Sequence, residues 1–348
     1  MDTQNTSSEI DKLASKLQKA TLPANLHDKA FEQIERINLA LKYGGNLSQL
    51  DITTKYIDWI SNLPWETKTE DVLDITKAQQ ILDSNHFGLE KIKKRIIEYL
   101  SLLIIHRQKM PTGIFHAPSL FFVGLAGTGK TTFAKSIAEA LGRKFVRIPF
   151  GGLSSALDLR GQSKTAPEAE PGMIIKAIRR AGSKNPVILL DELDRINPES
   201  RSAIMGVLIE LMDLQQNNNF TDYFIDYPVD LSQVLFVATA NNTNNISTAV
   251  MDRLEVIQMP SYTDTEKIEI AKRFVLPRYL KESGLTTDNL KIDETIWEKM
   301  VRPLGFDPGI RTVERLIESI VRVTAYKIVS GQGQNFMVNE GNLKEFIS

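Results

Sequence analysis

A glycine-rich stretch, GLAGTGKTT, follows the apolar run Leu120–Val123 and leads into the helical pattern FAKSIAEAL. It fits G-x-x-x-x-G-K-[ST], in which glycines let backbone N–H groups turn toward phosphates without an obstructing Cβ. Lys130 is expected to reach the β and γ phosphates, and the Thr131 hydroxyl to ligate Mg²⁺. A plain glycine-rich turn is the alternative. The expected nucleotide-binding loop comprises Gly124, Leu125, Ala126, Gly127, Thr128, Gly129, Lys130, Thr131 and Thr132.

Two adjacent acids, Asp191 and Glu192, end a second apolar run, PVILL. Asp191 is expected to hold hydrated Mg²⁺, and Glu192 to polarise the attacking water as general base. Two acids at the end of an apolar strand are costly to bury without a cation, which favours this interpretation. The alternative is an exposed acidic strand end.

Three further polar residues have the type and position to act on a triphosphate. Asn241 follows the apolar run VLFVATA, where its amide would contact the γ-phosphate or the lytic water, although it also suits a turn. Arg253 precedes another apolar run and is a candidate arginine finger; the alternative is a surface ion pair with Asp252 or Glu255. Arg311, at the start of a helical pattern, is either a second cation for the phosphates or an ordinary first-turn arginine.

Short apolar runs alternate with helical patterns from Ser119 onward, which predicts a parallel sheet with crossover helices. The flanking regions show apolar residues at helical spacing. The strands are expected at residues 120–123, 145–149, 187–190, 234–238 and 256–259. Helices are expected at residues 9–19, 27–42, 55–63, 75–83 and 89–107, and after the sheet at 264–280, 293–300 and 309–329.

The composition is that of a soluble globular protein, with 42 basic and 43 acidic residues and a formal net charge of −1. No overall positive field therefore indicates a nucleic-acid partner. Cysteine is absent, which excludes disulfides, thiolate nucleophiles and cysteine-bound zinc. The N-terminus lacks a signal-peptide pattern and no apolar run is long enough to span a bilayer, so a cytoplasmic location without a membrane segment is expected.

Several segments together resemble the ATPase portion of Lon, the ATP-dependent protease of the AAA+ superfamily. The similarity runs from about residue 10 to the end, and its motifs occur in family order. The segments that carry it are DWISNLPWET, ILDSNHFGLEKIKKRIIEYL, GRKFVRIPFGGL, KNPVILLDELD, QQNNNFTDYF, VLFVATAN, MDRLEVI and PGIRTVERLI.

The resemblance implies ATP and Mg²⁺ as cofactors and gives each motif a family role. The loop from Gly124 matches the Walker A motif, with Thr131 toward the metal, and Asp191 and Glu192 match the Walker B acids. Asn241 then corresponds to sensor 1, Arg253 to the arginine finger and Arg311 to sensor 2. The stretch HFGL matches the family segment beside the adenine ring, so Phe87 and Gly88 are expected to contact the base.

The implied fold is an α/β P-loop AAA+ ATPase with a parallel five-stranded sheet. Residues 1–66 are expected to form a helical neck, residues 67–260 the large ATPase domain, and residues 261–348 a small all-helical lid domain. No part of this sequence matches the family's peptidase domain with its serine and lysine dyad, so we expect ATPase activity without a peptidase site in this chain.

The loop expected to line a central pore departs from the family pattern. The family grips polypeptide with an aromatic and then an aliphatic residue, and Ala166 and Pro167 occupy those positions here. A large aromatic contact contributes a few kcal/mol at about 25 cal/mol per Å², and an alanine methyl contributes little of that. Glu168 and Glu170 are expected to make the loop acidic.

Three functions stay open at this point. The first is a ring-forming ATPase, a homo-hexamer by resemblance, that remodels or unfolds proteins in quality control without cutting them. The second is the motor half of a serine protease whose peptidase part is separate or truncated away. The third is a nucleotide-dependent switch or assembly scaffold, which the Ala166–Pro167 pair favours.

Overall fold

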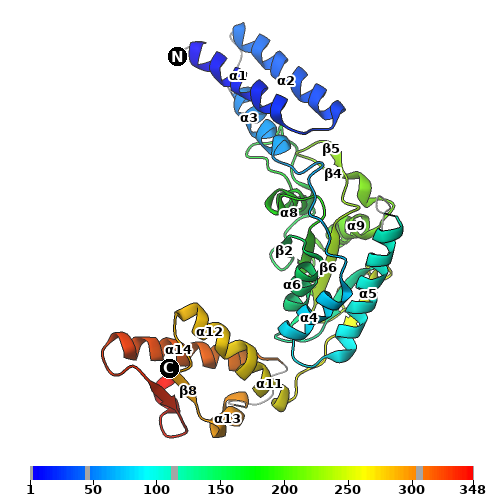
Figure 1. Ribbon diagram of the computed structural model, residues 1–348. Helices are drawn as coiled ribbons and strands as arrows, with labels where there is room; N and C mark the ends of the chain where they lie inside the picture. Colours follow the sequence, from blue (N-terminus) through cyan, green and yellow to red (C-terminus); the bar gives the residue numbers. More distant parts are fainter. Residues whose placement is uncertain (1–2, 44–47, 111–116, 303–308, 348) are drawn as a thin grey trace. The chain divides into compact units, whose positions relative to one another are not determined.

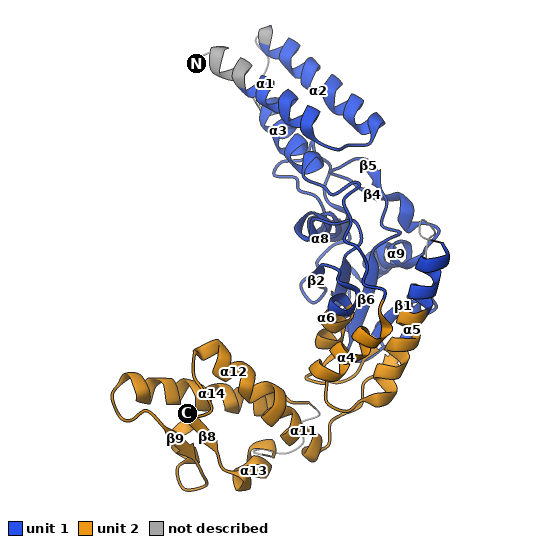
Figure 2. Ribbon diagram, viewed as in Figure 1, with its two compact units in different colours: residues 1–73, 102–121, 138–256 blue, residues 74–101, 122–137, 257–348 orange. Residues whose placement is uncertain are grey.

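The computed structural model describes residues 3–43, 48–110, 117–302 and 309–347. The chain divides into two compact units, coloured separately in Figure 2. Their boundary crosses two strands, β1 (Ser119–Val123) and β7 (Leu254–Gln258). Unit 1 comprises residues 1–73, 102–121 and 138–256, and unit 2 comprises residues 74–101, 122–137 and 257–348.

A five-stranded sheet with the order β2-β3-β6-β1-β7 confirms the predicted fold class. Two of its strands, β2 and β6, are labelled in Figure 1. The remaining three strands are β2 (Phe145–Pro149), β3 (Val187–Asp191) and β6 (Leu235–Ala240). The pairs β2–β3 and β3–β6 are parallel, and their register places Pro149 beside Asp191 and Val187 beside Leu235. Each strand lies within a few residues of its predicted position.

The burial of the strand residues explains why apolar runs in the sequence predicted the strands. Every residue of β3 and β6 is buried, as expected for parallel strands that have neighbours on both sides and helices on both faces. The strand β2 lies at the end of the strand order and alternates between buried and exposed side chains. One row of β2 side chains, which includes Arg147, therefore remains accessible.

The other elements of unit 1 are the predicted N-terminal helices, the crossover helices and a hairpin that the sequence analysis did not predict. The hairpin strands pair antiparallel, with Phe220 beside Val229. The N-terminal helices are α1 (Thr3–Lys19), α2 (Ala24–Lys42) and α3 (Ser48–Ser61). The rest are α7 (Leu157–Arg160), α8 (Met173–Ala181), α9 (Arg201–Met212), α10 (Thr248–Met251), β4 (Phe220–Asp222) and β5 (Tyr227–Val229).

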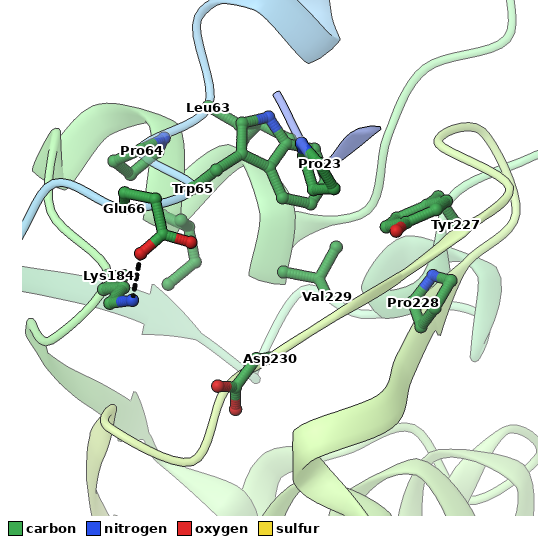
Figure 3. Close-up of a pocket in the computed structure, with 11 residues that line it drawn as sticks. Pro23, Leu63, Pro64, Trp65, Glu66, Lys184, Tyr227, Pro228, Val229 and Asp230 are labelled. Atoms are coloured by element: carbon green, nitrogen blue, oxygen red, sulfur yellow. Dashed lines mark hydrogen bonds and ion pairs between the residues drawn. The ribbon is translucent and has the colours of Figure 1, made fainter. Parts of the chain in front are cut away.

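The segment after α3 packs on the hairpin around a pocket of about 220 Å³ (Figure 3). The Trp65 ring meets Tyr227 edge-on, with 5.8 Å between centroids, and its indole N–H donates to the Ile60 carbonyl at 2.8 Å. Lys184 pairs with Glu66 at 3.1 Å on the other side of the pocket. Aromatic packing and one ion pair thus fasten this segment to the rest of unit 1.

Unit 2 contains two helical segments that precede the sheet and the predicted C-terminal lid. The lid core includes Trp297, Ile317 and Phe346. Its helices are α11 (Asp264–Ile270), α12 (Leu276–Ser283), α13 (Trp297–Val301), α14 (Arg311–Val329) and α15 (Leu343–Phe346). The remaining helices are α4 (Ile75–Asn85), α5 (Glu90–Lys109) and α6 (Lys130–Leu141), of which α5 and α6 extend into unit 1.

The lid differs in two details from the helices that the sequence predicts. The strands β8 (Leu290–Ile292) and β9 (Phe336–Val338) form a short parallel pair, and three residues are too few for a readable alternation. A π turn at Ala271–Val275 also interrupts the predicted helix 264–280. Pro277 follows this turn, and because proline has no N–H to donate, the helical hydrogen-bond pattern changes there.

Candidate active site

The phosphate loop in unit 2 has the backbone that the glycines predict. Gly127 and Gly129 adopt φ angles of +81° and +93°, which residues with a Cβ rarely reach, and α6 begins at Lys130. The Lys130 ammonium is folded over the loop and donates to the carbonyl oxygens of Gly124 and Leu125, the latter at 3.0 Å. Amides at a helix N-terminus with one ammonium form a cradle suited to phosphate.

Two glycines of this loop are required by close backbone packing. A Cβ at Gly124 would lie 2.5 Å from the Met259 carbonyl oxygen, and one at Gly127 would lie 3.2 Å from Gly309 Cα and Arg311 Cγ. The Ile310 N–H donates to the Gly127 carbonyl at 3.3 Å. The lid segment that carries Arg311, the first residue of α14, therefore packs directly on the loop.

Tyr262 is a neighbour of the loop that the sequence analysis missed. Its hydroxyl donates to the Thr128 carbonyl at 3.1 Å, while Thr128 Oγ1 donates to the Leu125 carbonyl at 2.9 Å. Burial, with a smaller effect from the Glu266 charge, raises the pKa of Tyr262 to about 12, so it remains a donor. Only its position shortly after the last strand could have hinted at this contact.

The HFGL segment packs against the helix that begins at the loop. The His86 ring stacks on Phe133 of α6, with 3.7 Å between centroids, and its Nε2 lies 2.9 Å from Ser136 Oγ. Burial and then the Lys93 charge lower the His86 pKa from 6.5 to about 4, so the ring is neutral. Phe87 packs against the lid core.

Phe87 and Gly88 also meet the first lid helices. The Arg273 guanidinium lies 5.3 Å from the centroid of the Phe87 ring, and a Cβ at Gly88 would lie 3.5 Å from Glu266 Oε1. Gly88 adopts a φ of +61°. The two residues proposed to contact the base thus share unit 2 with the loop and Arg311.

Asp191 ends β3 in unit 1 and is almost fully buried, at 4% exposure. Its Oδ2 accepts from Nε of Arg147 at 2.6 Å, and its Oδ1 accepts from the Thr239 hydroxyl of β6. Both partners come from neighbouring strands, so the strand register places them beside the carboxylate. Neither partner was predicted from the sequence.

Glu192 leaves the strand in a left-handed conformation with a φ of +61°, which is uncommon for a residue with a Cβ. Its N–H donates to Thr239 Oγ1 at 3.0 Å, and its Oε2 lies 3.3 Å from an Arg195 nitrogen. Such strain persists where surrounding contacts enforce it, often at functional sites. In this structure each of the two acids is paired with an arginine.

Asn241 follows β6 and belongs to the same part of unit 1. Its backbone N–H and its amide both donate to Asp194, at 3.0 and 3.2 Å. The Asp194 carbonyl in turn accepts from the Asn245 amide at 3.2 Å. The predicted strand-end amide is therefore held beside the turn that follows Glu192.

Arg253 forms an ion pair within its own chain, but with an unexpected partner. Its NH2 lies 2.9 Å from Asp213 Oδ2, and its NH1 donates to the Ala249 carbonyl at 2.8 Å. This pair, with contributions from backbone hydrogen bonding, lowers the Asp213 pKa. Asp252 and Glu255 were the partners considered from sequence, and the structure replaces them with Asp213.

The loop that carries Ala166 and Pro167 is closed at its base by a hydrogen bond from Gln162 N to Glu170 O at 3.1 Å. Glu170 lies 2.5 Å from Lys176 and 3.7 Å from Lys55, so its charge is balanced and the loop is less acidic than expected. A cavity of about 710 Å³ beside it is lined by Leu157, Gln162, Ser163, Lys164, Thr165, Ala166, Tyr223 and Asp226.

The available protein oxygens suit Mg²⁺ better than a metal ion whose ligands all come from protein side chains. Among the described residues, no group of three or more His, Cys, Asp or Glu side chains could hold a metal ion. Mg²⁺ commonly uses one or two protein oxygens, with substrate phosphates and waters completing its shell. The buried carboxylate of Asp191 in unit 1 and the hydroxyl of Thr131 in unit 2 are each an oxygen ligand of the kind that Mg²⁺ uses. Within the described part of the chain, no helix is long and apolar enough to cross a membrane.

Comparison with known proteins agrees with these features. Residues 120–262 match the ATPase family associated with various cellular activities (AAA), and residues 281–336 match the Lon protease AAA+ ATPase lid domain. The chain is 41% identical over 339 residues to Lon protease of Heliobacterium modesticaldum, which covers 97% of this chain and 41% of that protein.

Two other relatives give the same picture. Identity is 40% over 339 residues to Lon protease of Lawsonia intracellularis, covering 97% of this chain and 40% of the relative. It is 43% over 323 residues to Lon protease of Dictyoglomus thermophilum, covering 93% and 40%. The chain thus spans about two-fifths of the length of these curated relatives. It belongs to the Lon protease family, of which it contains the AAA+ ATPase module and its lid domain.

Proposed function

We propose that this chain binds ATP with Mg²⁺ and hydrolyses it. The observation that carries the proposal is the preformed phosphate loop of unit 2, which begins α6 at Lys130. Asp191 and Glu192 of unit 1 supply the acids, at the end of a strand, β3, of the five-stranded sheet to which β1 also belongs. Ligands of parallel α/β sheets bind outside the carboxyl ends of the strands. Phe87 and Gly88 would contact the adenine base, and Arg311 the phosphates.

Each residue has a distinct task in this proposal. The Lys130 ammonium and the loop amides bind the β and γ phosphates, and Thr131 and Asp191 hold Mg²⁺. The ion, when bound, neutralises charge that develops on the phosphate oxygens. Glu192 accepts a proton from the attacking water once its carboxylate leaves Arg195, and Asn241 orients that water or the γ-phosphate.

We further propose that the module works in a homo-oligomeric ring, a hexamer, on polypeptides. Arg253 supports this because its guanidinium, 31% exposed, can exchange Asp213 for a phosphate presented by a neighbouring subunit. The relatives are named Lon protease, so in a complete system the motor would deliver polypeptide to a peptidase. The division into neck (1–66), large domain (67–260) and lid (261–348) belongs to this proposal.

Mixing two inactive variants tests the shared site. Arg253→Ala and Lys130→Ala should each lose ATPase activity, and mixtures should regain part of it, because a subunit with Arg253 completes a neighbour that has Lys130. Sizing of the particle in ATP should show the ring. If mixtures stay inactive while both variants assemble, the finger does not act between subunits.

A nucleotide switch is the second candidate, because Ala166 and Pro167 offer little surface for gripping a chain. The ATPase rate with and without an unfolded protein separates the two functions. Stimulation by the unfolded protein supports a motor that acts on polypeptides. An unchanged rate supports the switch.

A further inference from the structure

The buried carboxylate of Asp191 already has a cationic partner. Its side chain is 6% exposed, and Nε of Arg147 lies 2.6 Å from Oδ2, while the Thr239 hydroxyl occupies Oδ1. A buried carboxylate without a counter-charge is strongly disfavoured. In this structure, Arg147 supplies that charge.

Strand register explains how Arg147 reaches this position. In β2, Arg147 is paired with Leu189, two residues before Asp191 in β3, and its side chain lies on the accessible row of the strand. The Arg147 side chain is 50% exposed, so its guanidinium can move into solvent once another cation neutralises the buried Asp191. Asp191 is the fixed member of the pair and Arg147 the movable one.

The same oxygen is the one that a hydrated Mg²⁺ would need. With Oδ1 engaged by Thr239, a water of the Mg²⁺ shell would approach Oδ2, where Nε of Arg147 donates at 2.6 Å. A carboxylate oxygen can accept two hydrogen bonds, but the guanidinium and the divalent ion repel each other when both lie at the same carboxylate. Arrival of the metal and departure of Arg147 are therefore coupled.

We propose that Arg147 is a resident counter-ion that Mg²⁺ displaces from Asp191, so that Arg147 sets the Mg²⁺ concentration needed for nucleotide binding. This inference rests on the proposed role of Asp191 as a metal-holding residue. Arg147 acts through Asp191 and is a positioning residue. Removal of the Arg147 side chain should lower the stability of the protein without nucleotide. It should also make Mg²⁺ bind more tightly.

Equilibrium binding of a fluorescent ATP analogue, titrated with MgCl₂, tests the proposal without measuring turnover. Arg147→Gln should lower the half-saturating Mg²⁺ concentration about fivefold, as expected for loss of a half-exposed ion pair. The melting temperature of the nucleotide-free variant should fall by a few degrees. Arg147→Lys, which keeps the charge but loses the guanidinium geometry, should shift both quantities less.

Lys144→Gln is the matched control, because it removes an exposed charge just before the same strand and should change neither quantity. In an Asp191→Asn background, Arg147→Gln should cause no further shift. A half-saturating Mg²⁺ concentration that stays unchanged or rises in both Arg147 variants overturns the inference. The proposed function fails separately if the wild-type protein binds the analogue equally well with and without Mg²⁺. It also fails if Asp191→Asn leaves the Mg²⁺ dependence of binding unchanged.

Discussion

The phosphate loop in unit 2 and the acidic strand end in unit 1 are held by different kinds of contact. Backbone packing fixes the loop, because Gly124 and Gly127 lie against main-chain atoms of Met259 and Gly309. Ion pairs hold the acids, since Asp191 pairs with Arg147 and Glu192 with Arg195. A ligand cannot displace backbone packing of this kind, whereas it can replace one partner of an ion pair.

This difference predicts that the loop controls ATP affinity and that the acids control the rate of hydrolysis. A loop whose backbone is already shaped loses little entropy when phosphate binds, so it should determine affinity. Acids that must change partners before they act should determine the chemical step. Substitutions in the two regions should therefore affect different measurements.

The largest effect is expected at the acids. Glu192→Gln keeps the shape of the side chain and removes the base, so turnover should fall about 1000-fold while ATP affinity changes little. Single-turnover hydrolysis and equilibrium binding check the two halves of this expectation. Glu199→Gln, an exposed acid of the same region, is the control. Turnover equal to that of the control would assign the base to another residue.

At the loop, Lys130→Ala should weaken ATP binding about 100-fold, or about 2.7 kcal/mol, because it removes charge-assisted hydrogen bonds to phosphate. Calorimetry measures the affinity. Lys135→Ala, an exposed lysine on the same helix, should bind as the wild type does. Retention of wild-type affinity by Lys130→Ala would contradict the phosphate role of the loop.

Acidification should weaken the scaffold of the loop through His86. Its folded pKa of about 4 lies below the unfolded value of 6.5, so only the unfolded chain gains a proton between these values and stability falls as pH falls. The loss between pH 7 and 5 should be about 2 kcal/mol. Urea unfolding at both pH values should show a smaller pH effect in His86→Gln.

Unit 1 should show the opposite and smallest pH effect through Asp222. Burial raises its pKa from 3.8 to about 6, although the N–H groups of Gly172, Phe224 and Ile225 donate to it. The folded protein therefore gains a proton before the unfolded chain does, and stability rises by about 1 kcal/mol from pH 7 to 5. Compared with wild type, Asp222→Asn should lose this gain in the same urea experiment. An identical pH dependence in the two proteins would mean that the carboxyl is not buried as described.

The sequence predicted the elements whose signals are local. The loop motif, the buried strand β3 and the first turn of α14 each depend on a few consecutive residues, and each lies where the pattern places it. The family resemblance extended this reading to Asn241 and Arg253, although their roles remain predictions.

The partners of the site residues could not be predicted, because they come from distant parts of the chain. Arg147 reaches Asp191 only through the register of β2 and β3, and Asp213 reaches Arg253 across 40 positions. Tyr262 contacts the loop 134 positions away. A pattern within one segment has no information on such pairs, which depend on the assembled fold.

The packing of Gly309 against the phosphate loop has a mechanical consequence. A Cβ there would lie 2.5 Å from the Ala126 carbonyl oxygen, and the Ile310 N–H is bonded to Gly127. A rotation of α14 would therefore displace the peptide groups of the loop directly, because the two backbones touch with no side chain between them. If the loop binds a triphosphate as proposed, this backbone contact would couple the nucleotide to the orientation of the lid.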